Sequence, residues 1–248
     1  MSARLENLRV VLVATRNPLN IGAAARAMSN FGASDLRLVR PYETSFREAR
    51  SAVGAGELLT RAGVFNSVAE AVADCRVVVG TTAASRRDIQ HPLRGLEAGA
   101  RAIRRQFGAG PVALLFGSEK RGLSNDDFSH CHWLVRIPTR KEHGAMNLGQ
   151  AVAVCLYELA RPGRAEDKMT TAATKSNISA KAAPARAEDL ERLTQLLFHA
   201  LHVSGYVKPK LSSATEEKVR RLVRRMDLSA GDAELWLGML RQIGWKLG

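Results

Sequence analysis

The amino-acid sequence predicts an α/β fold in which helices cover both faces of a parallel sheet. Residues 8 to about 160 alternate short apolar, β-branched runs with segments whose apolar residues recur at helical spacing. Continuously apolar strands separated by helices are typical of parallel sheets that are buried on both faces. The chain has 248 residues, of which 46% are hydrophobic. This is enough for one domain of about 150 residues and a smaller part beside it.

The expected elements follow from these runs in order. Strands are predicted at Leu8–Ala14, Leu36–Val39, Val77–Thr81, Val112–Phe116 and Trp133–Ile137. Helices are predicted at Asn20–Phe31, roughly Phe46–Thr60, Ser67–Asp74, Leu96–Gln106 and Leu148–Arg161. Because ligands of such sheets bind beside the carboxyl ends of the strands, function is sought first in the loops that follow them.

The last third of the chain differs in composition. Residues Pro162–Ala187 are rich in Ala, Thr, Ser, Lys, Pro and Gly, which predicts a flexible linker. Leucines then return at helical spacing, a capping box at Ser213–Glu216 predicts a second helix, and Ser229–Asp232 opens a third. We therefore expect one domain over residues 1–161 and a small all-α domain over 188–248. The linker should allow the two to be separated without exposing a shared core.

The charge of the chain is strongly basic. It holds 37 Lys and Arg against 24 Asp and Glu, a net charge of +13. An excess of this size indicates a polyanionic partner, with nucleic acid as the first candidate. The aromatic content of 5% favours backbone and shape contacts over base stacking. The candidate RNA contacts in the second C-terminal helix are Lys218, Arg221, Arg224 and Arg225; a merely solvated basic face is the alternative.

Other features exclude several classes of protein. No apolar run approaches the ~20 residues of a membrane span, and the N-terminus does not resemble a signal peptide, so we expect a cytoplasmic protein. The cysteines Cys75, Cys131 and Cys155 are widely spaced, which suits a reducing compartment. In an extended segment, Cys131 would point away from His130 and His132. With no fourth ligand nearby, we expect no metal site.

The most informative segment is Asn17–Arg26, directly behind the first predicted strand. Asn20 is a good helix N-cap residue. Gly22 lies one turn before Arg26 on the same face of the predicted helix, which leaves space beside the guanidinium. Such a helix start is suited to phosphate or a charged ligand. Taken alone, however, an outward Arg is more often an ordinary solvated residue.

Two later loops strengthen the functional interpretation. Phe116–Ser124 resembles a phosphate loop, but Leu123 stands where a P-loop needs Lys, which leaves a tight turn that presents Glu119. After the fifth strand, Ile137-Pro138 precedes a polar stretch and then Asn147, a predicted N-cap. Small residues there let a ligand rest on exposed backbone groups.

In this order the three segments resemble the motifs of the SpoU/TrmH branch of the SPOUT-class RNA 2′-O-ribose methyltransferases. The first motif corresponds to Asn20–Arg26, the second to Phe116–Leu123, and the third to Ile137-Pro138 with Met146–Leu148. The resemblance covers residues 8 to about 160. The opening segment, Gly80–Ala83 and the helical C-terminal extension look most like TrmJ-type tRNA methyltransferases.

The resemblance implies a fold, a cofactor and an assembly. Such proteins thread the C-terminal part of the α/β domain into a deep trefoil knot, which binds S-adenosylmethionine in a bent shape. They pair as homodimers that complete each active site. Carried over by position, the cofactor pocket comprises Thr81, Thr82, Ala83, Gly117, Ile137, Gly144, Ala145, Met146 and Leu148. Backbone groups should do most of the adenine recognition there.

The implied reaction is methyl transfer to a ribose 2′-hydroxyl of tRNA, at the cytidine or uridine in position 32 of the anticodon loop. Arg26 matches the family's catalytic arginine. It would stabilise the developing alkoxide and clamp a phosphate, because a guanidinium is a poor general base. Asn20 would orient Arg26 or the ribose, Glu119 would hold the second motif, and Asn147 would position substrate or cofactor.

One position departs from the family pattern, because Ala145 stands where many relatives carry Ser. A phosphate contact by that hydroxyl is therefore absent. Two other functions stay open at this point. One is methylation of rRNA or of another tRNA site, and the other is a non-catalytic role in RNA binding or assembly. Cofactor binding separates the last from the others, since a scaffold need not bind S-adenosylmethionine.

Overall fold

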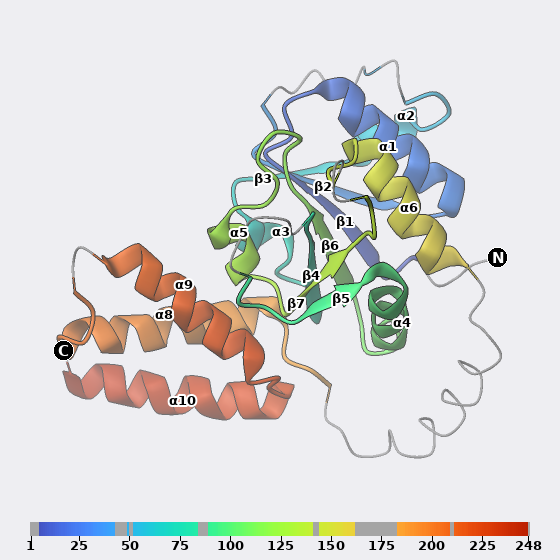
Figure 1. Cartoon of the computed structure of the whole chain (residues 1–248). Helices are drawn as coiled ribbons and strands as arrows, with labels where there is room; N and C mark the ends of the chain where they lie inside the picture. The colour runs from blue at the N-terminus through green and yellow to red at the C-terminus, as the bar shows by residue number, and fades with distance from the viewer. Residues whose placement is uncertain are drawn as a thin grey trace.

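The chain folds around one twisted sheet with helices on both faces (Figure 1). The computed structural model describes residues 5–42, 49, 52–83, 89–140, 144–161, 183–208 and 211–247. The strands are β1 (Leu8–Val13), β2 (Asp35–Val39), β3 (Gly63–Phe65), β4 (Val77–Thr81), β5 (Leu93–Gly95), β6 (Val112–Phe116) and β7 (Trp133–Arg136). Their order across the sheet is β3-β2-β1-β6-β4-β7-β5, and the pairings between them are parallel. The predicted α/β class with a parallel sheet is confirmed.

The helices fall into two groups. Those of the first 160 residues are α1 (Pro18–Phe31), α2 (Gly56–Arg61), α3 (Val68–Ala71), α4 (Leu96–Gln106), α5 (Asn125–Ser129) and α6 (Leu148–Ala160). The C-terminal helices are α8 (Ala187–Val203), α9 (Ser212–Arg225) and α10 (Ala230–Leu247). Among the described residues, no helix is both long and apolar enough to span a membrane.

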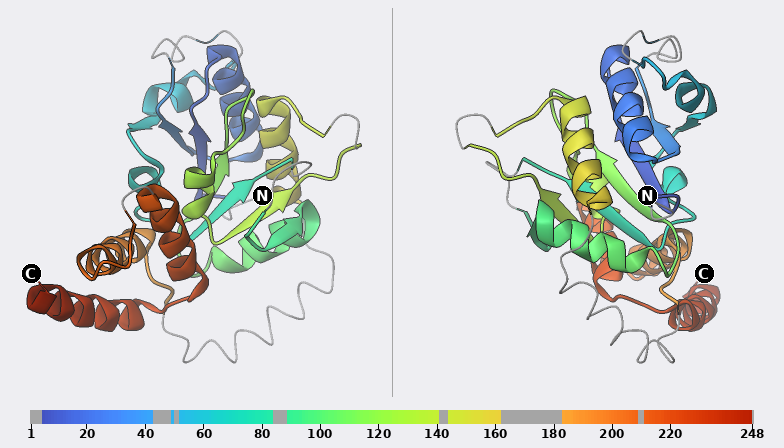
Figure 2. Two further views of the ribbon diagram at one scale, coloured as in Figure 1. Left: turned by 60° about the vertical axis from the view of Figure 1, so that its left-hand side comes forward. Right: turned by 90° about the vertical axis from the view of Figure 1, so that its right-hand side faces the viewer.

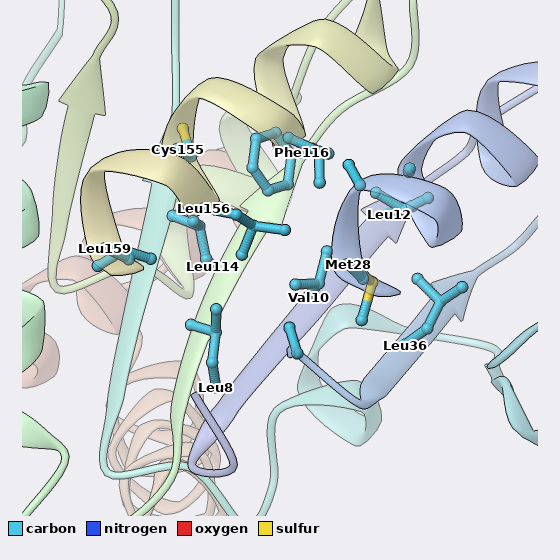
Figure 3. Close-up of a cluster of buried hydrophobic side chains, with 14 of the residues drawn as sticks. Leu8, Val10, Leu12, Met28, Leu36, Leu114, Phe116, Cys155, Leu156 and Leu159 are labelled. Atoms are coloured by element: carbon cyan, nitrogen blue, oxygen red, sulfur yellow. The ribbon is translucent and has the colours of Figure 1, made fainter. Parts of the chain in front are cut away.

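Two apolar clusters sandwich the sheet, because successive strand residues point to opposite faces. On one face, strand residues such as Val10 and Leu114 pack against α1 and α6 (Figure 3), and residues of α4 belong to the same cluster. On the other, Val11 and Leu115 pack with residues of α3 and α5. The helices α1 and α6 approach closely, since a Cβ on Gly149 would lie 2.6 Å from the Cβ of Ala23. The carboxyl ends of the strands, where the candidate motifs lie, are thereby held on a rigid frame.

The structure corrects several expected element boundaries. The first helix begins at Pro18, with Asn17 rather than Asn20 as its N-cap, because Pro is well suited to the first helical position. Of the helix expected at Phe46–Thr60, part lies outside the described residues. The described part becomes helical only at Gly56, after a turn in which Gly54 has a φ of 75°. The strands β3 and β5 were not predicted, since each has only three residues and little burial.

The C-terminal helices form a third apolar cluster of their own, which includes Leu193, Val223 and Leu237. They gather on one side of the sheet, beside α3 and α5 (Figures 1 and 2). The helix α9 already begins at Ser212, so the capping box expected at Ser213–Glu216 is wrong. Ser229 does cap the last helix, because its hydroxyl accepts the Asp232 N–H at 3.1 Å.

A buried polar interface joins these helices to the α/β part. Arg220 is 5% exposed and reaches Glu191 at 3.0 Å, and it also contacts Asp126 and Ser129 beside the sheet. The Ala187 N–H donates to the Cys75 carbonyl at 2.8 Å. The two parts are therefore joined by buried polar contacts that the sequence pattern does not predict, so separating them would expose these groups. Residues 162–182 of the expected linker lie outside the described residues, but Ala185 and Ala187 at its end are buried in the fold.

Candidate functional site

A cavity of about 320 Å³ opens at the carboxyl edge of the sheet, between the loops after β4, β6 and β7 and the start of α6. The residues expected to bind a cofactor all line it: Thr81, Thr82, Ala83, Gly117, Ile137, Gly144, Ala145, Met146 and Leu148. Residues 141–143 of the third motif lie outside the described residues. Segments that are far apart in the sequence thus meet around one space.

The loop after β6 is a tight turn that only glycine permits at its start. A Cβ on Gly117 would lie 2.0 Å from the backbone carbon of Gly122. Gly122 itself has a φ of 67°, a left-handed conformation that disfavours other residues. The Gly122 N–H donates to the Ser118 carbonyl at 2.8 Å, which closes the turn. This geometry brings the turn to the wall of the cavity and projects Glu119 at its rim.

Hydrogen bonds fix the opposite wall. The Thr81 hydroxyl donates to the Leu115 carbonyl at 2.8 Å, and the Thr82 N–H donates to the Val135 carbonyl at 3.0 Å. The Thr139 hydroxyl donates to the Gly144 carbonyl at 3.1 Å. Backbone positions beside the cavity are therefore set by the sheet and its loops, as a preformed binding site requires.

Three of the expected catalytic residues form one network at the edge of this cavity. The Asn20 amide donates to Glu119 Oε1 at 2.7 Å, and the Asn147 amide donates to Asn20 Oδ1 at 3.0 Å. Asn147 also caps α6 as predicted, because its Oδ1 accepts the Gly149 N–H at 2.9 Å. Asn20 lies inside α1 and does not cap it, so its side chain is free to link the other two. The three motifs are thus joined through side chains about 100 residues apart or more in the sequence.

Glu119 is the anionic centre of the network. Partial burial acts to raise the pKa of its carboxyl. The Asn20 amide and backbone N–H groups, including that of Arg16, outweigh burial and hold the pKa below its usual value. Glu119 is therefore ionised at neutral pH. Both of its oxygens accept hydrogen bonds, which suits a residue that holds loops together better than one that takes up a proton.

Arg26 does not join this network within one chain. It lies on the exposed face of α1 and does not line the cavity. It follows Asn20 by six positions, which is about 9 Å along the helix axis at the usual rise per residue. Among the described residues Arg26 has no hydrogen-bond or ion-pair partner. Its guanidinium is therefore available to a group outside this chain.

The expected RNA contacts on α9 divide into two sets. Lys218 and Arg225 are exposed, and the side chain of Arg221 is 14% exposed and lies 3.7 Å from Glu217. The prediction that Arg224 contacts RNA is wrong, because its side chain is only 1% exposed and contacts Glu191 at 3.4 Å. It also donates to the Ala187 carbonyl at 3.2 Å. Arg224 belongs to the interface between the helices and the sheet, where RNA cannot reach it.

Nine further cavity residues were not among those expected to bind the cofactor. They are Phe116, Ser118, Lys120, Arg121, Gly122, Leu123, Phe128, Val135 and Ala151. Six of them, from Phe116 to Leu123, belong to the second motif, but Phe128 comes from α5, a helix that the sequence pattern does not predict. Its signal was present, since Ser124 and Asp127 form a capping box with hydrogen bonds of 2.8 and 3.1 Å.

Comparison with known proteins identifies the family of the chain. The family model of the SpoU rRNA Methylase family matches residues 7–157. The tRNA (cytidine/uridine-2′-O-)-methyltransferase TrmJ of Sodalis glossinidius is 36% identical over 240 residues, which cover 96% of this chain and 92% of that relative. TrmJ of Klebsiella pneumoniae is 34% identical, with 96% and 97% covered.

Solved structures agree on the fold. The crystal structure of TrmJ from Z. mobilis ZM4 has a TM-score of 0.81 and 32% identity, covering 95% of this chain and 98% of that one. A probable methylase family protein from Haemophilus influenzae has a TM-score of 0.57 and 28% identity, covering 98% of both chains. The chain therefore belongs to the SpoU rRNA methylase family, and its likeness to TrmJ extends over 96% of its length.

Proposed function

We propose that this protein is an S-adenosylmethionine-dependent methyltransferase that modifies a ribose 2′-hydroxyl of tRNA. The observation that carries the proposal is the junction of the three motifs, where Asn20, Glu119 and Asn147 meet beside the cavity. The TrmJ relatives, which share 34–36% identity across nearly the whole chain, act on cytidine or uridine in tRNA. We propose the same substrate class here, at position 32 of the anticodon loop.

The cavity fits the cofactor in size and in lining. Its volume of about 320 Å³ is within the range of about 300–1,000 Å³ found for small-molecule and cofactor sites. Leu123, Phe128 and Leu148 offer apolar surface for an adenine ring. The turn at Gly117 brings backbone within reach of a ligand, where any larger residue would clash. S-adenosylmethionine would supply a sulfonium-activated methyl group at this place.

The side chains around the cavity can position the ribose and stabilise the charge that develops on it. Asn20 and Asn147 present amides held by Glu119, and they would orient the ribose at the cavity mouth. Arg26 would donate hydrogen bonds to the 2′-oxygen as its proton is lost. A guanidinium cannot accept that proton, and Glu119 is committed to Asn20 and Arg16. The proton therefore leaves to a phosphate oxygen or to water.

We propose that the active unit is a homodimer in which Arg26 reaches the cavity of the other subunit. Arg26 is exposed and unpaired among the described residues of its own chain, while the rest of the network is complete without it. The helices α1 and α6 both expose large apolar side chains, Leu19 at 53% and Tyr157 at 56%. These two helices pack together and would face the second subunit.

We also propose that the segment from β6 to α6 is threaded as the trefoil knot that the resemblance implies. The support is the arrangement of the sheet, in which β4 lies between β6 and β7 while the loops after all three converge on one cavity. The exposed cations of α9, Lys218 and Arg225, would add phosphate contacts to tRNA. We place this activity in the cytoplasm, where tRNA is modified in bacteria.

Two measurements test this proposal. Calorimetry should detect binding of S-adenosylmethionine and S-adenosylhomocysteine, which a scaffold protein need not bind. Mass-spectrometric mapping of 2′-O-methyl groups in total RNA should show a loss at position 32 of tRNA when the gene is removed. Loss of a methyl group from rRNA would instead identify rRNA as the substrate. An unchanged map would contradict an enzymatic role.

A further inference from the structure

An exposed tyrosine and an arginine lie side by side at the carboxyl ends of β1 and β2. The Arg16 guanidinium carbon lies 5.5 Å from the centroid of the Tyr42 ring. The Tyr42 backbone N–H donates to the Thr15 carbonyl at 3.2 Å. Tyr42 is 69% exposed and Arg16 is also exposed. The backbone therefore holds the two side chains together while much of the ring is left in water.

This pair is tied to the active-site network. The Arg16 N–H donates to Glu119 Oε2 at 3.4 Å, and the other oxygen of Glu119 accepts from Asn20. The same carboxylate thus holds the loop that carries Arg16 and the side chains proposed to orient the ribose. Arg16 is therefore one hydrogen bond away from a residue that lines the cavity, and Tyr42 lies against Arg16.

The backbone leading to the pair is strained. Ala14 and Arg40, which directly follow β1 and β2, have φ values of 51° and 47°. Residues with a Cβ rarely adopt this left-handed region, and such strain is concentrated at functional sites. The Thr15 hydroxyl is buried and, among the described residues, has no hydrogen-bond partner. These features lower the stability of the fold, and an exposed cation–π pair stabilises it only slightly. The conformation is therefore better explained by a function than by stability.

We propose that Arg16 and Tyr42 form a stacking platform for one base of the RNA next to the methylated ribose. Bases in single-stranded loops are recognised by stacking on aromatic rings and on Arg guanidinium planes. The guanidinium would also attract the backbone phosphates. The low aromatic content of the chain predicted little base stacking, but one well-placed ring is enough for a single base. This inference deepens the proposed function and rests on it.

The test is a scan of abasic positions in an anticodon stem-loop RNA with unmodified C32. Methyl transfer by the wild type and by Tyr42→Phe and Tyr42→Leu is measured on the intact RNA and on RNAs lacking one base at position 31, 32, 33 or 34. Loss of one stacking contact should raise the KM of Tyr42→Leu roughly 5- to 150-fold on the intact RNA. Tyr42→Phe keeps the ring and should retain most of the activity.

The platform predicts that the Tyr42→Leu penalty disappears on the one abasic RNA whose missing base is the stacking partner, as in a double-mutant cycle. An unchanged KM for Tyr42→Leu, or a penalty of the same size on every abasic RNA, would overturn the proposal. S-adenosylmethionine affinity and melting temperature should match the wild type in both variants. If the affinity or the melting temperature of a Tyr42 variant differs from that of the wild type, Arg16→Met is used as the second probe. Tyr206→Ala, at a ring that is 71% exposed on the C-terminal part, is the matched control.

Failure of the proposed function has a different signature. If the wild type methylates neither the intact stem-loop nor full-length tRNA, the proposed activity itself is contradicted. If the wild type methylates the RNA and Tyr42→Leu does so with the same KM, only the stacking platform is removed and the proposed activity stands.

Discussion

At the scale of single residues, the site depends on contacts between distant side chains. The sequence motifs identify Asn20, Glu119 and Asn147 as candidates, but their mutual hydrogen bonds of 2.7 and 3.0 Å exist only in the fold. The role of Asn20 was misread as a helix cap, because Asn and Pro at positions 17 and 18 start the helix earlier. A local pattern cannot reveal which of two Asn residues caps a helix and which one is left to bind a distant partner.

Arg26→Ala should cut methyl transfer by at least about 100-fold, the scale of losing one electrostatic contact to the transition state. Because Arg26 is exposed and does not line the cavity, cofactor affinity and fold should be nearly unchanged. Single-turnover assays and calorimetry check the two parts. Arg61→Ala is the control, because Arg61 is an exposed arginine of α2 whose ion pair, among the described residues, is with Glu57. A variant with near-normal turnover would remove Arg26 from the mechanism.

The half-buried His132 predicts a pH dependence of stability. Burial, with the nearby Arg224 charge, lowers the pKa of His132 to about 3, and its Nδ1 accepts the Val78 N–H at 3.1 Å. The unfolded chain binds a proton below about pH 6.5, whereas the folded chain does not. The contribution of His132 to the free energy of unfolding is therefore fully present above about pH 6.5 and is lost as the pH decreases toward 3.

His132→Asn keeps an acceptor near Val78 and removes this titration. Urea unfolding is measured between pH 7 and 5, above the range in which most carboxyls titrate. The free energy of unfolding of His132→Asn should change with pH less steeply than that of the wild type, by about 1 kcal/mol per pH unit. His199→Asn removes a histidine from an exposed position and serves as the control. Equal slopes for the wild type and His132→Asn would show that His132 takes up its proton at the same pH in the folded and in the unfolded protein.

At the scale of elements, α9 carries cations on two faces with different roles. Lys218 and Arg225 point to solvent, whereas Arg220 and Arg224 are buried against Glu191. Composition predicted one basic surface for this helix, because a count of charges does not distinguish its faces. The apolar residues of α8 and α10 predicted the helices themselves, but the buried ion pairs that dock them on the sheet follow from the fold alone.

Replacing both exposed cations, Lys218→Gln with Arg225→Gln, should weaken tRNA binding and flatten its salt dependence. Each lost phosphate contact reduces the slope of log Kd against log salt by about 1. Filter binding across a salt series measures the slope, and Arg101→Gln on α4, at a half-exposed arginine, is the control. An unchanged slope would make the outer face of α9 merely solvated.

The inner face gives a matched comparison. Arg224→Met should lower the free energy of unfolding by about 2 kcal/mol or more, because it removes hydrogen bonds from a buried carboxylate and a buried carbonyl. The salt slope of tRNA binding should stay as in the wild type. Unchanged stability with a flatter slope would return Arg224 to the RNA contacts.

At the scale of the whole molecule, the strand order places every motif at one edge of the sheet. Alternating patterns predicted the parallel sheet and the five longer strands within a residue or two. The short edge strands β3 and β5 have too few buried residues to produce such a pattern. The cavity could be predicted from the family resemblance and not from periodicity, since it depends on how three loops fold over one another.

Mixing two inactive variants should restore activity if two subunits share each site. Arg26→Ala and Asn147→Ala subunits, once exchanged, form mixed dimers in which one of the two sites is intact, so activity should return to about a quarter of the wild type. Light scattering confirms that dimers form. Mixed dimers without activity would show that Arg26 acts within its own chain, and a fully active monomer would contradict the dimer altogether.

Methylation of the 2′-hydroxyl of nucleotide 32 can be measured directly on a purified RNA. Purified protein is incubated with labelled S-adenosylmethionine and two otherwise identical tRNA transcripts, one with C32 and one with 2′-deoxycytidine at that position. We expect one methyl group on the first transcript, mapped to the ribose of C32 by mass spectrometry, and none on the second. Equal labelling of both transcripts, or no labelling of either, would contradict this expectation.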